Sequence, residues 1–267
     1  MVLQMTCIMM LSKSSKTHEA FFSLYGNEAI GNINRGHSNV ISYFQLKEIN
    51  RQLAEENSHL RTQLASNYIA PDSSRKITID SSITDTSGKY RKYTFLPARV
   101  VGNSYTLQNN FLTLERGSLQ GVEVGMSVIG PQGIVGSVLF VSENFSIVMS
   151  VLNRNSRVSA MLKKDNSAGS VEWNGENPYY LTLKNIGKGS KIIIGDTVLT
   201  SSYSANFPSK IMIGTIAEKT ADPSSNFYTL KVKASTNFAS LEYVYVVKNI
   251  RYSEQKVLES KEQKVND

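Results

Sequence analysis

The sequence predicts a mostly β protein whose sheet region follows a short coiled-coil helix. Residues 92–250 contain many short runs rich in Val, Ile, Leu, Thr and Tyr, and glycine-containing turns separate these runs about every 8–15 residues. This pattern lacks helical periodicity and is typical of β-sandwiches and β-barrels. Upstream, leucines recur every seven residues within residues 43–68, which is the spacing of a coiled coil.

The composition excludes several kinds of site. The chain has 267 residues, a formal net charge of +7 and one cysteine, Cys7. A single cysteine forms neither an internal disulfide nor a paired-cysteine metal site. The basic residues are spread along the chain, and no zinc-finger, helix-turn-helix or RNA-binding motif accompanies them. We therefore expect no nucleic-acid partner, no metal and no cofactor.

Residues 1–42 are interpreted as the remnant of a membrane anchor followed by a linker. The stretch from Met1 to Leu11 is apolar except at Gln4 and Thr6, whereas a helix needs about 20 apolar residues to cross a bilayer. No basic residue precedes this stretch, as a signal peptide would require. A truncated transmembrane helix is the preferred interpretation, and an interfacial or disordered start is the alternative.

Residues 43–68 predict a coiled-coil helix that pairs two copies of the chain. Glycine and proline are absent, and good helix formers dominate. A buried asparagine at an a position favours a parallel, in-register dimer, because it is satisfied only by a second asparagine. An amphipathic helix packed on its own domain is the alternative. The predicted dimer contacts are Leu46, Leu53 and Leu60 at d positions and Asn50, Asn57 and Leu64 at a positions.

The sheet region carries a weak internal echo that favours two β domains. Gly125 begins a run that reads G-x-x-V-I and leads to a strand with Gly136, and Gly195 begins G-x-x-V-L and leads to a strand with Gly214. Glycine inside a strand often marks a bulge or a bend of a small barrel. After a connector at 69–91, we place the first barrel at 92–152, with the end of the core as a possible addition. The second barrel is placed at 153–250 and a polar tail at 251–267, and whether the barrels are consecutive or interleaved stays open.

The sheet region lacks the residues of a hydrolase. A Ser-His-Asp or Cys-His mechanism needs an imidazole, and His59 is the last of the three histidines. No cysteine follows Cys7. We therefore predict no catalytic residue, and Asp196 is interpreted as a turn residue that accepts backbone hydrogen bonds. Aromatic residues near turns are candidates for contacts, and the first candidate is the loop with Tyr203, Phe207 and Pro208.

Two ordered signatures resemble the family of rod shape-determining proteins called MreC. The segment from Pro97 to Asn153 carries glycines at 117, 121, 125, 133 and 136 where that family's pattern has them. The later segment GDTVLTSSYSANFPSKIMIGTI, which begins at Gly195, resembles the family's second signature. Ser202 and Lys210 stand where the family usually has glycine. If those positions need a positive φ, a side chain costs roughly 1–2 kcal/mol there.

The resemblance implies a fold and a function. It implies two small six-stranded β-barrels of chymotrypsin-like topology without catalytic residues, and a core that dimerises or forms filaments in the periplasm, tethered to the inner membrane. It also implies contacts with a class B penicillin-binding transpeptidase, with MreD and with the MreB cytoskeleton, in a scaffold that maintains rod shape. Two alternatives stay open: a peptidoglycan- or carbohydrate-binding β module that uses Trp173 and nearby tyrosines, and a cell-wall hydrolase.

Overall fold

The computed structural model describes residues 3–6, 46–64, 67–69, 90–204, 206–221, 225–250 and 252. The predicted anchor remnant and linker, most of the connector and nearly all of the tail lie outside these residues. The chain divides into two units, Met1–Leu53 and Ala54–Asp267. Residues 46–63 are helical, as the heptad pattern predicts. After the helix in the sequence, β1 (Tyr68–Ile69) pairs with β2 (Tyr90–Arg91) in a two-stranded sheet.

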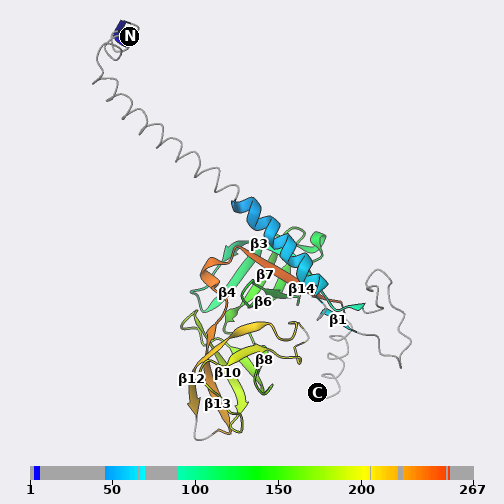
Figure 1. Cartoon of the computed structure of the whole chain (residues 1–267), viewed down its shortest axis with the longest axis vertical. Coiled ribbons are helices and arrows are strands. Elements are labelled where there is room, and N and C mark those ends of the chain that lie inside the picture. The colour runs from blue at the N-terminus through cyan, green and yellow to red at the C-terminus, as the bar shows by residue number, and fades with distance from the viewer. Residues whose placement is uncertain are drawn as a thin grey trace, which may run out of the picture. The chain divides into compact units, whose positions relative to one another are not determined.

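The first barrel is a closed antiparallel sheet of six strands (Figure 1). Five of them follow one another in the sequence. The sixth is β14, the last strand among the described residues, which pairs with both β3 and β5 and so closes the barrel. A 3-10 turn, Ser118–Gln120, lies between β4 and β5. The strands are β3 (Tyr93–Asn103), β4 (Asn109–Leu114), β5 (Ser127–Ile129), β6 (Ile134–Val141), β7 (Ser146–Asn153) and β14 (Tyr243–Asn249).

The second barrel is inserted between β7 and β14. It is also a closed antiparallel sheet of six strands, and a 3-10 turn, Phe238–Ser240, leads from it back to β14. Its strands end at Ala234, so residues 243–249 belong to the first barrel rather than to the second. The strands are β8 (Val158–Leu162), β9 (Ala168–Glu172), β10 (Tyr180–Gly187), β11 (Thr197–Thr200), β12 (Met212–Ala221) and β13 (Phe227–Ala234).

The two barrels share one strand order, and the echo in the sequence marks equivalent hairpins. Val128 of β5 faces Gly136 of β6, and Val198 of β11 faces Gly214 of β12. A bulge follows the valine in both pairs. Read around each barrel, β14-β3-β4-β7-β6-β5 corresponds to β8-β9-β10-β13-β12-β11. The place of the first strand of the second barrel is therefore taken in the first barrel by β14.

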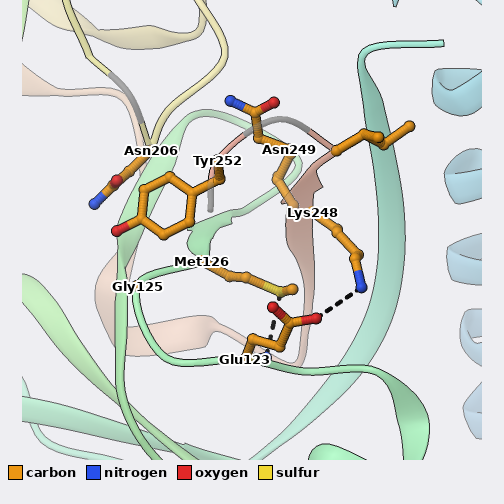
Figure 2. Close-up of a pocket in the computed structure, with 9 residues that line it drawn as sticks. Glu123, Gly125, Met126, Asn206, Lys248, Asn249 and Tyr252 are labelled. Carbon is orange, nitrogen blue, oxygen red and sulfur yellow. Dashed lines mark hydrogen bonds and ion pairs between the residues drawn. The ribbon is translucent and has the colours of Figure 1, made fainter. Parts of the chain in front are cut away.

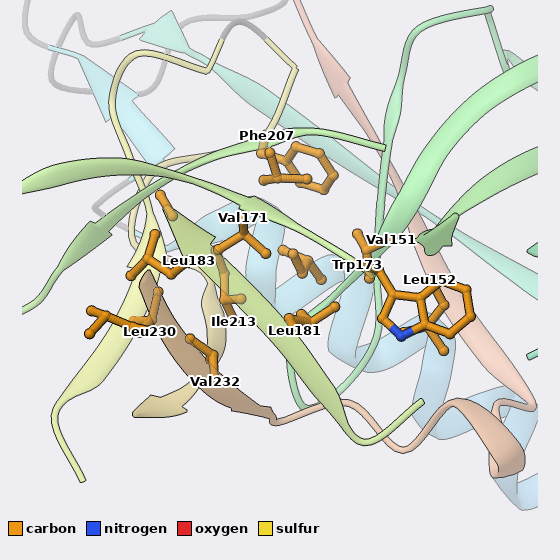
Figure 3. Packing of buried hydrophobic residues seen from close by; sticks show 14 of the residues in the cluster. Val151, Leu152, Val171, Trp173, Leu181, Leu183, Phe207, Ile213, Leu230 and Val232 are labelled. Carbon is orange, nitrogen blue, oxygen red and sulfur yellow. The ribbon is translucent and has the colours of Figure 1, made fainter. Parts of the chain in front are cut away.

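A shared core joins the barrels. One cluster of buried residues combines Leu152 and Tyr245 of the first barrel with Trp173, Leu181 and many others of the second (Figure 3). A smaller cluster that includes Leu112 and Val246 fills the rest of the first barrel. The buried hydroxyl of Thr236 donates to the carbonyl of Ile134 at 2.8 Å and adds a polar contact between the barrels. The predicted fold class, mostly β with two six-stranded barrels and an N-terminal helix, is confirmed.

Candidate interaction surfaces

The helix of residues 46–63 exposes its leucines. Leu46, Leu53, Leu60 and Leu64 are each between 48% and 59% exposed. Asn57 is also exposed, whereas Asn50 is half-buried. Leucines at the a and d positions of a heptad lie along one side of a helix, and we call these four side chains the leucine stripe. Each of them is uncovered within the described part of the chain.

An adjacent face of the second half of this helix packs on the chain's own first barrel. Ala54 and Ser58 are buried, and one turn further on the Arg61 guanidinium lies 5.1 Å from the ring centroid of Tyr245 on β14. Burial raises the pKa of the Tyr245 hydroxyl, and the charge of Arg61 opposes that shift. Burial also lowers the pKa of the Arg116 guanidinium, which the nearby Glu55 raises. The helix thus packs on its own barrel, as the alternative predicts, while the predicted dimer contacts stay a prediction on a different face.

Asn67 fastens the end of the helix to β3. Its side-chain amide donates to the carbonyl of Tyr93 at 2.7 Å and accepts from the Tyr93 amide at 2.7 Å, as a neighbouring strand would. The same amide donates to the Thr62 carbonyl at 2.9 Å, which the helix end leaves without an intrahelical partner. Asn67 is buried. Sequence reasoning assigned no role to it, because a bond to a residue 26 positions away has no local signal.

The structure separates the members of the predicted contact loop. Phe207 is 4% exposed and belongs to the shared core, and Pro208 is also buried. Its carbonyl accepts from the Thr200 hydroxyl at 2.6 Å, which holds the loop closed. Only Tyr203 presents its side chain to solvent, with 83% exposure. Of the two positions where the resemblance expects glycine, Lys210 has a φ of 67°, whereas Ser202 has no positive φ.

Tyr252 covers a turn of the first barrel that directly precedes β5 (Figure 2). The turn comprises residues 123–126, and Gly125 has a φ of 90°. A Cβ atom on Gly125 would lie 2.5 Å from the Tyr252 hydroxyl oxygen, so the glycine makes room for the tyrosine. Beside them, Lys248 and Glu123 form an ion pair of 2.7 Å along a pocket of about 230 Å³. Tyr252 was assigned only to the polar tail by the sequence.

The aromatic residue of the carbohydrate-binding alternative is not available as a platform. Trp173 is 3% exposed, lies in the shared core and donates its indole N–H to the Asn177 carbonyl at 3.0 Å. A sugar-stacking ring needs an open face, so Trp173 cannot serve this alternative, and of the tyrosines near it Tyr179 is exposed. Asp196 accepts from the Ile193 amide at 2.8 Å, as its interpretation as a turn residue predicts.

The described residues hold no group of three or more His, Cys, Asp and Glu side chains that could bind a metal ion. None of the described helices is long and apolar enough to cross a membrane.

Comparison with known proteins places the chain in a family. The family model "Rod shape-determining protein MreC, barrel core" matches residues 100–248. The chain is 29% identical to the cell shape-determining protein MreC of Listeria monocytogenes over 167 residues, which are 61% of this chain and 57% of that protein. The chain thus spans little more than half the length of this relative.

Solved structures share the fold. The chain resembles MreC of Listeria monocytogenes with a TM-score of 0.55 and 25% identity, over 84% of this chain and 94% of that one. It also resembles the major periplasmic domain of the cell shape-determining filament MreC, with a TM-score of 0.52 and 23% identity, over 59% of this chain and 97% of that one. The family match covers the strands from β3 to β14, including the inserted second barrel, and the chain therefore belongs to the MreC family of cell shape-determining proteins.

Proposed function

We propose that this protein is a non-enzymatic scaffold of the bacterial cell-elongation machinery, which organises peptidoglycan synthases and so maintains rod shape. The observation that carries the proposal is the two-faced helix. One face contacts the first barrel through Arg61, with Asn67 just after the helix adding hydrogen bonds to β3, and another face leaves the leucine stripe open. A pair of chains joined along this stripe would present two copies of the barrels to partners. The proposed dimer contacts are Leu46, Asn50, Leu53, Asn57, Leu60 and Leu64.

The proposed partners follow from membership of the family. They are a class B penicillin-binding transpeptidase, MreD and, through them, the MreB cytoskeleton. The proposed location is the inner membrane, with the barrels in the periplasm. A solved relative described as a periplasmic domain supports this location for the barrels. Tyr203 is the proposed contact of the loop at 200–210, because its ring is the exposed one.

The experiment is a capture of purified class B transpeptidase on the immobilised chain. We expect specific capture, weakened by Tyr203→Ala. Tyr179→Ala is the matched control, since Tyr179 is an exposed tyrosine of a different loop, with 62% exposure. No capture by the folded wild-type chain would contradict the transpeptidase contact, and equal losses in both variants would contradict the choice of Tyr203.

A further inference from the structure

The chain builds the same turn twice, once in each barrel. In the first barrel the Gly125 amide donates to the Val138 carbonyl at 2.9 Å, and in the second the Gly195 amide donates to the Ile216 carbonyl at 2.8 Å. Gly125 and Gly195 have φ values of 90° and 94°. The two turns thus follow one backbone path, and their residues correspond one to one over 123–126 and 193–196.

The side chains at the ends of the two turns repeat the correspondence. The Glu123 amide donates to the Met126 sulfur at 3.4 Å, and the Ile193 amide donates to the Asp196 carboxylate at 2.8 Å. In each turn, the side chain of the last residue therefore accepts a hydrogen bond from the backbone amide of the first. The two turns agree in their backbone and side-chain hydrogen bonds. The groups that contact the first turn therefore indicate which groups could bind to the second.

The first turn is covered by the chain itself. The ring of Tyr252 lies against Gly125 (Figure 2). Glu123, the first residue of the turn, pairs with Lys248, which follows the β14 residues that face β5. An aromatic ring over the glycine and an acid–base pair beside it complete this surface.

The second turn is bare within the described part of the chain. No described atom lies within 4 Å of the position that a Cβ on Gly195 would take. Ile193 and Ile194 are 57% and 69% exposed. By strand register, Lys164 corresponds to Lys248, because Leu162 faces Val198 as Val246 faces Val128. The place of Glu123 is taken by Ile193, and the described residues form no ion pair with Lys164.

Positive charge surrounds this turn. Lys163 and Lys191 are exposed close to it, and the Lys163 amide donates to the Thr197 carbonyl at 3.0 Å. The nearest carboxylates are engaged by their own loops: Asp196 holds the Ile193 amide, and Asp165 accepts from the Ser167 amide at 3.0 Å. That backbone bond lowers the pKa of Asp165, which favours its charged form. Within the described residues this turn therefore has no aromatic cover and no acid paired with Lys164, although Asp165 itself is exposed.

We infer that the turn at 193–196 is a docking surface for a partner segment that carries a tyrosine beside a carboxylate. The aromatic ring would lie over Gly195 and against Ile194, as Tyr252 lies over Gly125, and the carboxylate would pair with Lys164, as Glu123 pairs with Lys248. Aromatic residues supply much of the binding energy of protein interfaces, and complementary charge steers and orients the encounter. This docking surface lies on a different loop from Tyr203, so it extends the proposed scaffold to a second contact.

The test is a titration of the isotope-labelled full chain with a short peptide that has one tyrosine between two glutamates, followed by the amide resonances of Ile194 and Gly195. We expect saturable shifts at these residues. Replacing the peptide's tyrosine by alanine, or both glutamates by glutamine, should weaken binding at least fivefold. Ile194→Ser and Lys164→Glu in the protein should do the same. Val124→Ser is the matched control, because Val124 is the 54% exposed counterpart of Ile194 in the covered turn.

Three results would overturn the inference. They are the absence of shifts at 193–196 with millimolar peptide, equal affinity for the alanine peptide, and equal affinity of the Ile194→Ser protein. Binding of an acidic peptide irrespective of its tyrosine would identify a general basic surface instead. The amide spectra of the variants show directly whether each one is folded, and the exposure of the substituted side chains leads us to expect that they are.

Discussion

At the scale of residues, two glycines have the same task in the two barrels. A Cβ on Gly136 would meet the Met149 carbonyl oxygen, and one on Gly214 would meet the Lys233 carbonyl oxygen. In each case a valine methyl group on the neighbouring strand lies within 2.9 Å as well. The adjacent strand therefore approaches too closely for a side chain at the point where each barrel bends.

Alanine at either glycine is expected to destabilise the fold. Overpacking of this kind costs about 1–3 kcal/mol, so Gly136→Ala and Gly214→Ala should each lower the free energy of unfolding by that amount in urea denaturation. Gly189→Ala is the control, since nothing described lies within 4 Å of its Cβ position, and it should change stability by no more than about 0.5 kcal/mol. Equal effects at all three positions would refute the argument from close approach.

Asn67 is the third residue with a specific structural role. Asn67→Ala leaves the Tyr93 amide and two carbonyls without the side chain that serves them. An unsatisfied buried polar group costs about 1–3 kcal/mol, and water reaches part of this site once the side chain is removed. We therefore expect a loss of about 2–4 kcal/mol in the free energy of unfolding. Asn109 is exposed, so Asn109→Ala is the control and should leave the denaturation midpoint nearly unchanged. An equally small effect of Asn67→Ala would show that the hydrogen bonds of Asn67 to Thr62 and Tyr93 do not stabilise the fold.

At the scale of elements, the helix is a connector with two working faces. Leu60 lies on the open stripe, whereas Arg61, its neighbour, holds the barrel. Burying a leucine contributes about 1.5–3 kcal/mol. A glutamate at position 60 would also place two like charges opposite one another in a parallel pair, which is unfavourable.

Leu60→Glu is accordingly expected to raise the dissociation constant of the dimer at least about tenfold, since 1.4 kcal/mol corresponds to a factor of ten. Sedimentation velocity over a range of concentrations measures this. His59→Glu, which adds the same charge at an exposed position off the stripe, should dissociate no more readily than the wild type. A wild-type chain that stays monomeric throughout, or a dimer indifferent to Leu60→Glu, would rule out pairing along this stripe.

At the scale of the whole molecule, the barrels are expected to unfold together. The second barrel is inserted between two strands of the first, and one buried cluster spans both. Trp173, the only tryptophan of the chain, lies in that cluster, so its fluorescence reports on the second barrel and the shared core. Circular dichroism reports on all strands.

The two signals should follow the same transition in urea, because coincident transitions are the mark of a cooperative two-state unit. Phe238→Ala, in the segment that leads from the second barrel back to β14, should shift both transitions to lower urea by the same amount. Two separate transitions in the wild type would show that the insertion and the shared core do not couple the barrels.

Much of the local structure follows from the sequence alone. The heptads predict the helix, and the repeated G-x-x-V motif finds equivalent hairpins with the same bulge. The turn role of Asp196 and the positive φ at Lys210 were also accessible. Each of these depends on residues near one another in the chain, where backbone periodicity and turn geometry determine which side chains fit.

The tertiary structure decided which distant segments meet. Residues far apart in the sequence meet where β14 pairs with β3, where Phe207 enters the shared core, where Asn67 bonds to Tyr93, and where Tyr252 covers Gly125. An alternating strand has one apolar face whichever partner it finds, so its pattern does not specify the partner. A closed barrel has no unpaired strand edge. Which strand pairs with the last open edge is determined only in the assembled sheet.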